Sequence, residues 1–332
     1  MSEDSMPLKR VQFGIIGAGR VARNRLAPAI HASRNATLYA AASRDHKRAA
    51  DLAPLVSYDS YNALLDDPAV DAVCIATHNG LHRELAIAAM HAGKHVLCEK
   101  PLGLDAAECA DMLAASRETG RLLVEAFMYR YHPQIDAVQR LIASGAIGEL
   151  RHLEASFCFR LADDEPSRLR AEWGGGALMD VGCYCVNAAR LFLGNSPSQV
   201  MATANFDPVH DVDRALHGIL GWEDGRHATI SCSFDAGLHQ GLVLVGTEGV
   251  LELHQPFKTT DVAGVAVVSP RVTLRTRRGE EQFTADPVNV YQLEMEDFAR
   301  AVSQGTSPLL GPGEGLLNAR IIDELLRAAR AG

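Results

Sequence analysis

The chain has 332 residues, of which 47% are hydrophobic and 22% are charged, and its formal net charge at pH 7 is -9. A chain of this length and hydrophobic content is expected to build about two domains with full cores. The acidic balance, without a long basic run, excludes nucleic acid and anionic membranes as expected partners.

Neither a targeting segment nor a metal-binding motif is expected from the sequence. The segment Met1–Pro7 lacks the apolar core of a signal peptide. No uninterrupted apolar run approaches the roughly 18 residues that a membrane-spanning helix needs. The seven cysteines form no Cys-x-x-Cys pair. We therefore expect reduced, mostly buried thiols in a cytoplasmic protein without a metal site.

The first predicted elements surround a glycine motif. A strand is predicted for Val11–Ile16, the motif is Gly17-Ala18-Gly19-Arg20-Val21-Ala22, and a helix is predicted for Arg23–Ala32. Strand, glycine turn and helix in this order are the context of a dinucleotide-binding fingerprint. Gly17 permits the tight turn, Gly19 lets the backbone approach the pyrophosphate, and the helix N-terminus attracts the phosphates. We expect the cofactor to contact Gly17, Gly19, Arg20 and Val21.

A second strand, predicted for Thr37–Ala42, ends in Ser43 and Arg44. An NAD site usually has an acidic residue here, which accepts hydrogen bonds from the ribose hydroxyls. A hydroxyl and a guanidinium suit the 2′-phosphate of NADP instead. We therefore favour NADP over NAD and expect Ser43 and Arg44 to bind it. Asp45 leaves NAD possible, because a small shift of the loop would bring its carboxylate into reach.

Strands and helices continue to alternate as far as residue 125. Alternation on this scale indicates a parallel sheet with right-handed crossovers. The polar loop 77–82 follows one of the strands and enters a helix, so we place it at the ligand edge of the sheet with the glycine motif. The predicted strands are 70–76, 95–99 and 122–125, and the predicted helices are 83–92 and 106–119.

One of these strands ends in Glu99, Lys100 and Pro101. Pro101 biases Lys100 towards an extended backbone, which holds the amine in place. An isolated Lys-Pro pair is more often a surface residue that closes a strand, because exposed lysines are the norm. Here the upstream dinucleotide motif favours the other interpretation. Since ligands bind beyond the carboxyl ends of parallel strands, we expect Lys100 in the ligand site.

After residue 126 the pattern changes to a run of strands, which indicates an α+β domain with a large, mainly antiparallel, open-faced sheet. We therefore predict two domains. Residues 1–126 form an α/β Rossmann domain that binds the dinucleotide, and residues 127–332 form a domain for substrate binding and dimerisation, whose last helices can pack back on the first domain. The predicted strands are 150–159, 200–206, 215–220, 228–233, 241–245, 250–253, 264–268 and 272–275, and the predicted helices are 134–144, 289–304 and 313–331.

A glycine-rich stretch at Gly174–Gly176 opens a predicted helix that runs to Leu193. Asp180, Tyr184 and Asn187 fall at i, i+4 and i+7, on one face of this helix. Polar groups on an otherwise apolar helix are costly unless a ligand or a neighbour satisfies them. The pattern therefore predicts either a substrate-binding face or a hydrogen-bonded core tyrosine with a capping aspartate.

These motifs resemble the glucose–fructose oxidoreductase / inositol dehydrogenase / rhizopine catabolism (Gfo/Idh/MocA) family over nearly the whole chain. The resemblance implies that Lys100 is the active-site lysine and that Asp180 and Tyr184 lie against the substrate and the nicotinamide. It also implies that Glu99 contacts the nicotinamide-side ribose. The loop residues that it implies at the cofactor are Thr77, His78, Asn79 and His82.

Two positions depart from members that resemble inositol dehydrogenase, and a third departs from the usual pattern of the family. Those members have histidine where this chain has Tyr184 and often aspartate where it has Asn187, and the family usually has proline at the position of His78. Tyrosine at 184 is similar to the branch of glucose–fructose oxidoreductase, D-xylose dehydrogenase and dihydrodiol dehydrogenase. The stretch 125–133 is similar to the same branch.

The resemblance implies an NADP- or NAD-dependent enzyme that exchanges a hydride with a secondary alcohol or carbonyl of a sugar (an aldose or an anhydrosugar) or a cyclic diol. A tyrosine with a reference pKa of about 10 is a poor base unless a cation lies close. We expect Tyr184 to act as the acid/base, Lys100 to favour its phenolate and to stabilise the developing alkoxide, and Asp180 to orient the sugar or Lys100. Whether Lys100 or Tyr184 moves the proton stays open.

Two other functions remain as alternatives, because a fold does not fix a function. One is a sensor that binds dinucleotide and sugar without turnover, and the other is a nicotinamide-dependent glycosidase. Arg160, Trp173 and His239 are candidates for the pocket wall. By the same resemblance we expect a homodimer or homotetramer that associates through the large sheet.

Overall fold

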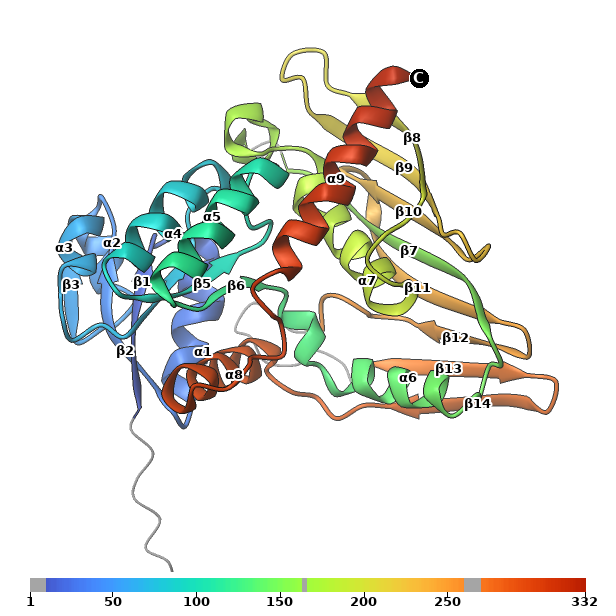
Figure 1. Ribbon diagram of the computed structural model, residues 1–332, viewed down its shortest axis with the longest axis horizontal. Helices are drawn as coiled ribbons and strands as arrows, with labels where there is room; N and C mark the ends of the chain where they lie inside the picture. The colour runs from blue at the N-terminus through green and yellow to red at the C-terminus, as the bar shows by residue number, and fades with distance from the viewer. Residues whose placement is uncertain (1–9, 163–165, 260–269) are drawn as a thin grey trace, which may run out of the picture.

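The computed structural model describes residues 10–162, 166–259 and 270–332, which form two sheets with helices packed on them (Figure 1). The first sheet has the strand order β3-β2-β1-β4-β5-β6, and all its neighbouring pairs are parallel. The order reverses between β1 and β4, and sheets of this kind bind ligands at such a reversal. The strands are β1 (Val11–Ile16), β2 (Ala36–Ala42), β3 (Val56–Tyr58), β4 (Ala72–Ile75), β5 (His95–Glu99) and β6 (Leu123–Ala126).

Helices cover both faces of the first sheet. Phe13 and Ile15 are fully buried in a core cluster with residues of α1 and α8, whereas Ile16 and Val73 are fully buried in a second cluster with residues of α4 and α5. Strands buried on both faces have continuous apolar sequences, which explains why they could be predicted. The helices are α1 (Ala27–Ala32), α2 (His46–Ala50), α3 (Tyr61–Leu65), α4 (His82–His91), α5 (Ala106–Thr119) and α8 (Val290–Gln304).

The second sheet has the strand order β14-β13-β12-β11-β7-β10-β9-β8. Its pairs are antiparallel except for β7 and β10, which run parallel. Strand β8 alternates between exposed and half-buried residues along its whole length. The strands are β7 (Leu150–Arg160), β8 (Gln199–Phe206), β9 (Asp213–Gly221), β10 (His227–Ser233), β11 (Asp235–Gly246), β12 (Gly249–Leu253), β13 (Arg271–Thr276) and β14 (Gly279–Thr284).

Of the α-helices in the described residues, three remain, and one of them contacts both the large sheet and a helix of the first sheet. Helix α6 (Pro133–Ala143) follows the first sheet. Helix α7 (Cys183–Leu193) packs on β7 and β10, and α9 (Glu314–Ala331) packs on β8 and also on α5 (Figure 1). The face that carries α7 and α9 is the one turned towards the first sheet (Figure 1).

The predicted fold class is confirmed, with differences in detail. The sequence pattern did not predict β14, because all its residues are exposed and apolar alternation is missing. The predicted strand at 264–268 lies outside the described residues. The helix predicted after the glycine-rich stretch begins as a π-helical turn, Leu178–Gly182. We propose that the boundary between the two domains lies between residues 126 and 127.

Candidate active site

A cleft of about 910 Å³ lies at the carboxyl ends of β1, β2, β4 and β5. Its wall combines loops of the first sheet with a segment of the second half of the chain that runs from Arg168 to Asp180. The expected site residues that line it are Gly17, Gly19, Arg20, Val21, Ser43, Arg44, Thr77, His78, Asn79, Glu99, Lys100 and Asp180.

The glycine motif forms one end of the cleft. Gly17 has a φ of 96°, and a Cβ at this position would lie 2.9 Å from the carbonyl oxygen of Ala76. Both observations require glycine. Directly after Gly19 the chain enters a π-helical turn, Ala22–Leu26, that continues into α1. Bare backbone followed by a helix N-terminus is the arrangement that binds pyrophosphate, so this end of the cleft fits a dinucleotide.

The end of β2 supplies the residues at the expected ribose position. Ser43, Arg44, Asp45 and Arg48 line the cleft, and Arg48 Nη2 donates a hydrogen bond to the Ala18 carbonyl at 3.0 Å. Asp45 Oδ1 accepts hydrogen bonds from the backbone N–H groups that begin α2. A carboxylate used as a helix cap is less available to ribose hydroxyls. The arrangement therefore favours a phosphate at this position.

The loop after β4 meets the second half of the chain across the cleft. The His78 ring stacks on Trp173 with a centroid distance of 4.4 Å and an interplanar angle of 13°. Asn79 Nδ2 donates a hydrogen bond to the Gly174 carbonyl at 2.9 Å. The Arg170 guanidinium lies 4.4 Å from the centroid of the Trp173 ring. Trp173, which the sequence could not place, is thus a wall residue of the cleft.

His82, which was expected at the cofactor, lies elsewhere. It is fully buried, and its ring nitrogens lie 3.0 Å from the Pro101 carbonyl and 3.4 Å from the Thr77 carbonyl. Burial lowers the pKa of His82 to about 4, so the ring is neutral at physiological pH. His82 is the first residue of α4 and not the last residue of the loop. Its buried ring therefore supports the loop and the turn after Lys100 through these two carbonyl contacts.

Lys100 reaches the cleft from the end of β5. Its Nζ donates hydrogen bonds to the backbone carbonyl of Asp180 at 2.6 Å and to Asp180 Oδ1 at 3.3 Å. The Lys100 side chain is 13% exposed, and the second carboxylate oxygen of Asp180 pairs with Arg168. Glu99 lies beside it, and burial raises the pKa of Glu99 to about 7 despite the neighbouring Lys100. The ligand edge thus presents a fixed ammonium group.

Tyr184 is placed differently from the expectation. Lys100 Nζ lies over the face of the Tyr184 ring, 5.0 Å from its centroid, whereas the hydroxyl points to Met128 Sδ at 3.7 Å. Burial raises the pKa of Tyr184 well above its ordinary value. The expected stabilisation of a phenolate by Lys100 is therefore absent from this geometry, because the ammonium contacts the ring and not the oxygen.

Asn187 does not join Asp180 and Tyr184 in a polar face. It is fully buried, and its Oδ1 accepts hydrogen bonds from Tyr129 Oη at 2.6 Å and from Arg130 Nη1 at 3.3 Å. The π-helical turn at 178–182 accounts for the difference, because its wider spacing shifts Asp180 relative to the residues of α7. Of the three, Asp180 is the one that lines the cleft.

Asp213, which no sequence motif indicates, holds the helix that carries Asp180. Its Oδ2 accepts the backbone N–H of Leu178 at 2.7 Å, and a Cβ on Gly176 would lie 2.2 Å from its other oxygen. Burial raises the pKa of Asp213 to about 7. An aspartate two residues before a predicted strand gave no signal of this role, which depends on the tertiary contact.

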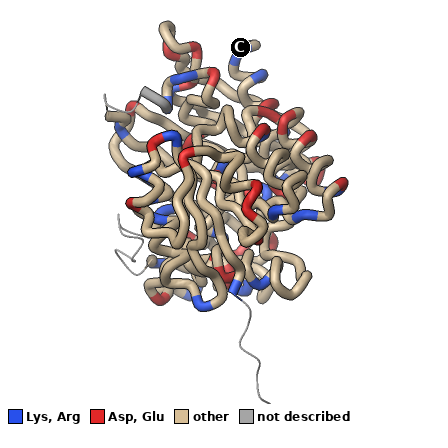
Figure 2. Tube along the Cα trace, turned by 90° about the vertical axis from the view of Figure 1, so that its left-hand side faces the viewer, with Lys and Arg blue, Asp and Glu red and all other residues tan. Residues whose placement is uncertain are grey.

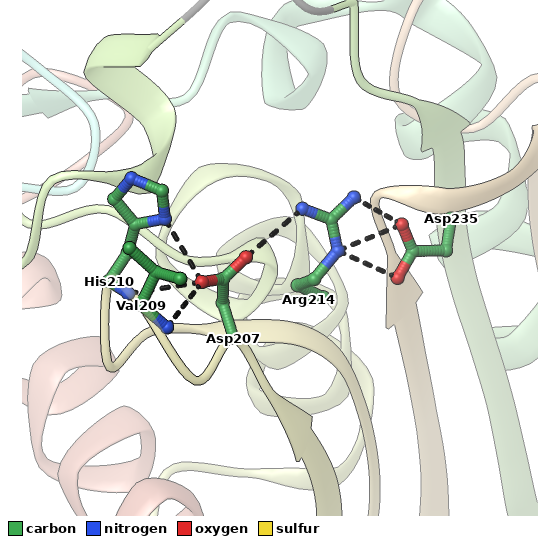
Figure 3. Close-up of polar contacts among 5 residues, drawn as sticks. All are labelled: Asp207, Val209, His210, Arg214 and Asp235. Atoms are coloured by element: carbon green, nitrogen blue, oxygen red, sulfur yellow. Dashed lines mark hydrogen bonds and ion pairs between the residues drawn. The ribbon is translucent and has the colours of Figure 1, made fainter.

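The residue after Asp213 anchors the same region to β11. Arg214 Nε donates to both carboxylate oxygens of Asp235 at 3.0 Å, and its Nη1 lies 3.4 Å from Asp207 Oδ2 (Figure 3). Asp207 also accepts the backbone N–H groups of Val209 and His210 at 2.9 and 3.0 Å (Figure 3). This network fixes the β8–β9 connection beside the helix start.

A second cavity of about 760 Å³ lies on the large sheet. His239, which was a candidate for the pocket wall, lines this cavity and not the cleft, and Arg160 lines neither of them. Within the described ranges, no three or more His, Cys, Asp or Glu side chains are arranged to hold a metal ion. None of the helices in the described part of the chain is long and apolar enough to cross a membrane.

Fold and cleft together define a dinucleotide-binding oxidoreductase, and comparison with known proteins gives the family. The model of an oxidoreductase family with an NAD-binding Rossmann fold matches residues 11–127. The model of the Gfo/Idh/MocA C-terminal domain matches residues 135–252. The chain therefore belongs to the Gfo/Idh/MocA family, as the sequence predicted.

Named relatives cover nearly the whole chain. It is 37% identical to D-xylose 1-dehydrogenase (NADP(+)) 2 of Haloferax volcanii, over 97% of this chain and 98% of that protein. It is 28% identical to a trans-1,2-dihydrobenzene-1,2-diol dehydrogenase of Xenopus laevis, over 95% and 97% of the two chains. The 3-ketoreductase KijD10 from Actinomadura kijaniata, solved with NADP and TDP-benzene, superposes with a TM-score of 0.90 at 31% identity, over 96% and 98% of the two chains.

These findings confirm the predicted activity class and cofactor class. The protein is a nicotinamide-dependent oxidoreductase that acts on CH–OH groups or the corresponding carbonyls, and its cofactor is NADP or NAD. They support this activity and not the sensor or glycosidase alternatives.

Proposed function

We propose that the protein is an NADP-dependent dehydrogenase of a sugar or cyclic diol, with an aldose as the first candidate. The observation that carries this proposal is the pair Lys100 and Asp180 at the edge of the dinucleotide cleft. The substrate class follows from the relatives, which include a D-xylose dehydrogenase and a dihydrodiol dehydrogenase. The preference for NADP rests on Ser43 and Arg44, together with the use of Asp45 as a helix cap.

Lys100 is the group that we assign to proton transfer. A nicotinamide cofactor held by the glycine motif and the end of β2 would supply the hydride chemistry at the reacting carbon. The Lys100 ammonium donates a hydrogen bond to the substrate oxygen and stabilises the negative charge that develops there. Proton transfer between this oxygen and Lys100 completes the reaction in either direction. Asp180 orients Lys100 through the contacts at 2.6 and 3.3 Å.

Tyr184 has a supporting role in this scheme. Its ring lies beneath the ammonium group of Lys100 at 5.0 Å, a contact that stabilises a cation when water is excluded. Its hydroxyl is buried against Met128. The geometry therefore supports Lys100 rather than Tyr184 as the group that moves the proton.

A panel of sugars and diols, assayed at 340 nm with NAD and NADP side by side, tests this function. We expect cofactor reduction with at least one aldose or diol and a higher kcat/KM for NADP. Binding of cofactor and sugar without turnover would support a sensor, and glycoside cleavage without net reduction would support a glycosidase. Either result would overturn the proposal.

We further propose that the large sheet forms a dimer with a second copy of the chain. Met201 on β8 and Ile219 on β9 are 56% and 42% exposed, and both line the second cavity. Exposed apolar residues around a hollow are typical of an interaction surface. Light scattering should give the wild type a mass at least twice that of the monomer. The double variant Met201→Glu/Ile219→Glu should have the mass of a single chain. A monomeric wild type would contradict this.

We also propose a cytoplasmic location and no nucleic-acid partner. All seven cysteines are free and buried, as expected in a reducing compartment. Figure 2 shows Lys and Arg interspersed with Asp and Glu along the described part of the chain, and the formal net charge of -9 disfavours binding to a phosphate backbone.

A further inference from the structure

Asp180 is shared by two cations in the active site. Its Oδ1 lies 3.3 Å from Lys100 Nζ, and its Oδ2 pairs with Nη1 of Arg168. The side chains of Lys100, Asp180 and Arg168 are 13%, 22% and 26% exposed, and all three line the cleft. The guanidinium group therefore belongs to the electrostatic environment of Lys100.

The fold holds Arg168 closely beside the start of the helix that carries Asp180. The Arg168 guanidinium lies 5.1 Å from the centroid of the Phe159 ring at the end of β7. Its backbone carbonyl accepts the N–H of Gly176 at 2.9 Å, and a Cβ on Gly175 would lie 2.6 Å from the same oxygen. Gly175 and Gly176 let the loop lie this close to the start of the helix, so the backbone position from which the Arg168 side chain extends is fixed.

We propose that Arg168 is a positioning residue of the active site: it fixes the carboxylate of Asp180 and limits how strongly that carboxylate holds the proton on Lys100. With Arg168 in place, one oxygen and part of the negative charge serve the guanidinium. Without it, both oxygens and the full charge are available to the ammonium of Lys100. The inference rests on the role of Lys100 proposed above.

The distribution of charge has a chemical consequence for a reversible reaction. In oxidation the lysine must accept a proton, and in reduction it must donate one. A lysine that a carboxylate holds too firmly in its charged form is a poor acceptor at neutral pH. Because Arg168 engages one oxygen of the Asp180 carboxylate, Lys100 stays able to accept a proton in oxidation and to donate one in reduction.

Other ionisable groups also face Lys100, but they leave the effect of Arg168 distinguishable. Glu99 and Glu125 come from β5 and β6, and Cys183 and Tyr184 come from α7. Burial raises the pKa of all four groups. None of them is replaced when Arg168 is changed, so a shift in the titration of Lys100 would report the loss of the guanidinium, which acts directly and through the carboxylate of Asp180.

The direct test measures the proton on Lys100 without relying on turnover. Competitive labelling with acetic anhydride between about pH 6 and 11, read by mass spectrometry of the peptide that carries Lys100, gives the midpoint at which the amine becomes reactive. We expect Arg168→Met to raise this midpoint by about one pH unit or more. Asp180→Asn should lower it, because the carboxylate itself is lost.

Two further variants separate charge from packing. Arg168→Lys keeps a cation and should return part of the shift, whereas Arg168→Gln keeps hydrogen-bond donors without charge and should not. Arg140→Met is the matched control, because Arg140 pairs with Asp136 on the exposed surface of α6. It should leave the midpoint unchanged, and thermal unfolding should show that all the variants are folded.

The kinetic readout is the pH profile of kcat/KM for alcohol oxidation. In Arg168→Met, the part of this profile in which activity rises as Lys100 loses its proton should move to higher pH. Activity that is lost at neutral pH should therefore return at alkaline pH. An unchanged labelling midpoint in a folded Arg168→Met variant overturns the inference. A shifted midpoint in a protein that oxidises no sugar or diol with either nucleotide supports the inference and overturns the proposed function.

Discussion

Lys100 lies where a parallel strand ends, and two oxygens of Asp180 fix its ammonium group. The ammonium also lies over the ring of Tyr184, whose hydroxyl is turned away to Met128. At the residue scale, the proton chemistry is therefore assigned to an amine held by a carboxylate. The phenol beneath it is buried, and its pKa lies well above its ordinary value.

The first prediction at this scale concerns Tyr184. Tyr184→Phe removes a hydroxyl that contacts Met128 and not Lys100, so kcat should fall by less than about tenfold. Steady-state kinetics with the best substrate of the panel measures it. A loss of about 10²–10⁴-fold, as expected for a residue that transfers a proton, would return the acid/base role to Tyr184.

The second prediction concerns the choice of nucleotide. Arg44→Ala should lower kcat/KM for NADP by about 10- to 100-fold, because a hydrogen bond to a charged group contributes about 1.5–3 kcal/mol. The value for NAD should change little. Lys47→Ala is the control, since Lys47 is exposed and lies outside the cleft lining. Equal losses for both nucleotides would mean that Arg44 does not contact a 2′-phosphate.

At the scale of elements, the loop after β4 and the segment before the π-helical turn meet across the cleft. His78 and Trp173 stack at 4.4 Å, and Asn79 bonds to Gly174. Gly80 lies against the same segment, since a Cβ there would be 2.6 Å from the carbonyl oxygen of Glu172. The cofactor wall is therefore built from both halves of the chain.

This contact predicts the effect of Trp173→Ala on cofactor binding. The variant loses the stack with His78 and the contact with Arg170, and the Kd for NADPH should rise about tenfold. Fluorescence titration of NADPH measures the change. Trp222→Phe is the matched control, because Trp222 lies outside the cleft lining. An unchanged Kd in Trp173→Ala would show that the stack does not contribute to the cofactor site.

The elements also show what the sequence could and could not predict. The bounds predicted for α5 agree with the structure because local signals set them: Asp105 accepts the backbone N–H of Glu108 at one end, and Gly120 has a φ of 65° at the other. The glycine motif and the end of β5 were predictable for the same reason. The π-helical turn, the buried cap by Asp213 and the position of Arg168 depend on contacts between distant segments, so no local pattern reveals them.

At the scale of the whole molecule, buried groups affect stability through their ionisation. Glu125 at the end of the first sheet is 3% exposed. Its Oε1 accepts the N–H of Leu102 at 2.9 Å, and burial raises its pKa from 4.5 to about 7. The folded state therefore binds a proton more tightly than the unfolded state. Its contribution to stability is greatest at low pH and is lost as the pH rises from about 4.5 to 7.

Glu125→Gln should remove this dependence while keeping the acceptor for Leu102. Relative to the wild type, the variant should gain on the order of 3 kcal/mol in the free energy of unfolding between pH 4.5 and pH 8, as a shift of this size implies. Urea unfolding at both pH values measures the difference. The exposed Glu149→Gln is the control. A gain that does not change with pH would mean that burial does not raise the pKa of Glu125.

The whole account depends on Lys100 at the meeting point of the two halves. The most direct test is Lys100→Met, with kcat measured on the best sugar or diol and the Kd for NADPH measured by fluorescence titration. We predict a loss of turnover of at least about 10²-fold with a Kd within about threefold of the wild type, because the glycine motif and the end of β2 still hold the dinucleotide. Near-normal turnover in this variant would contradict the account.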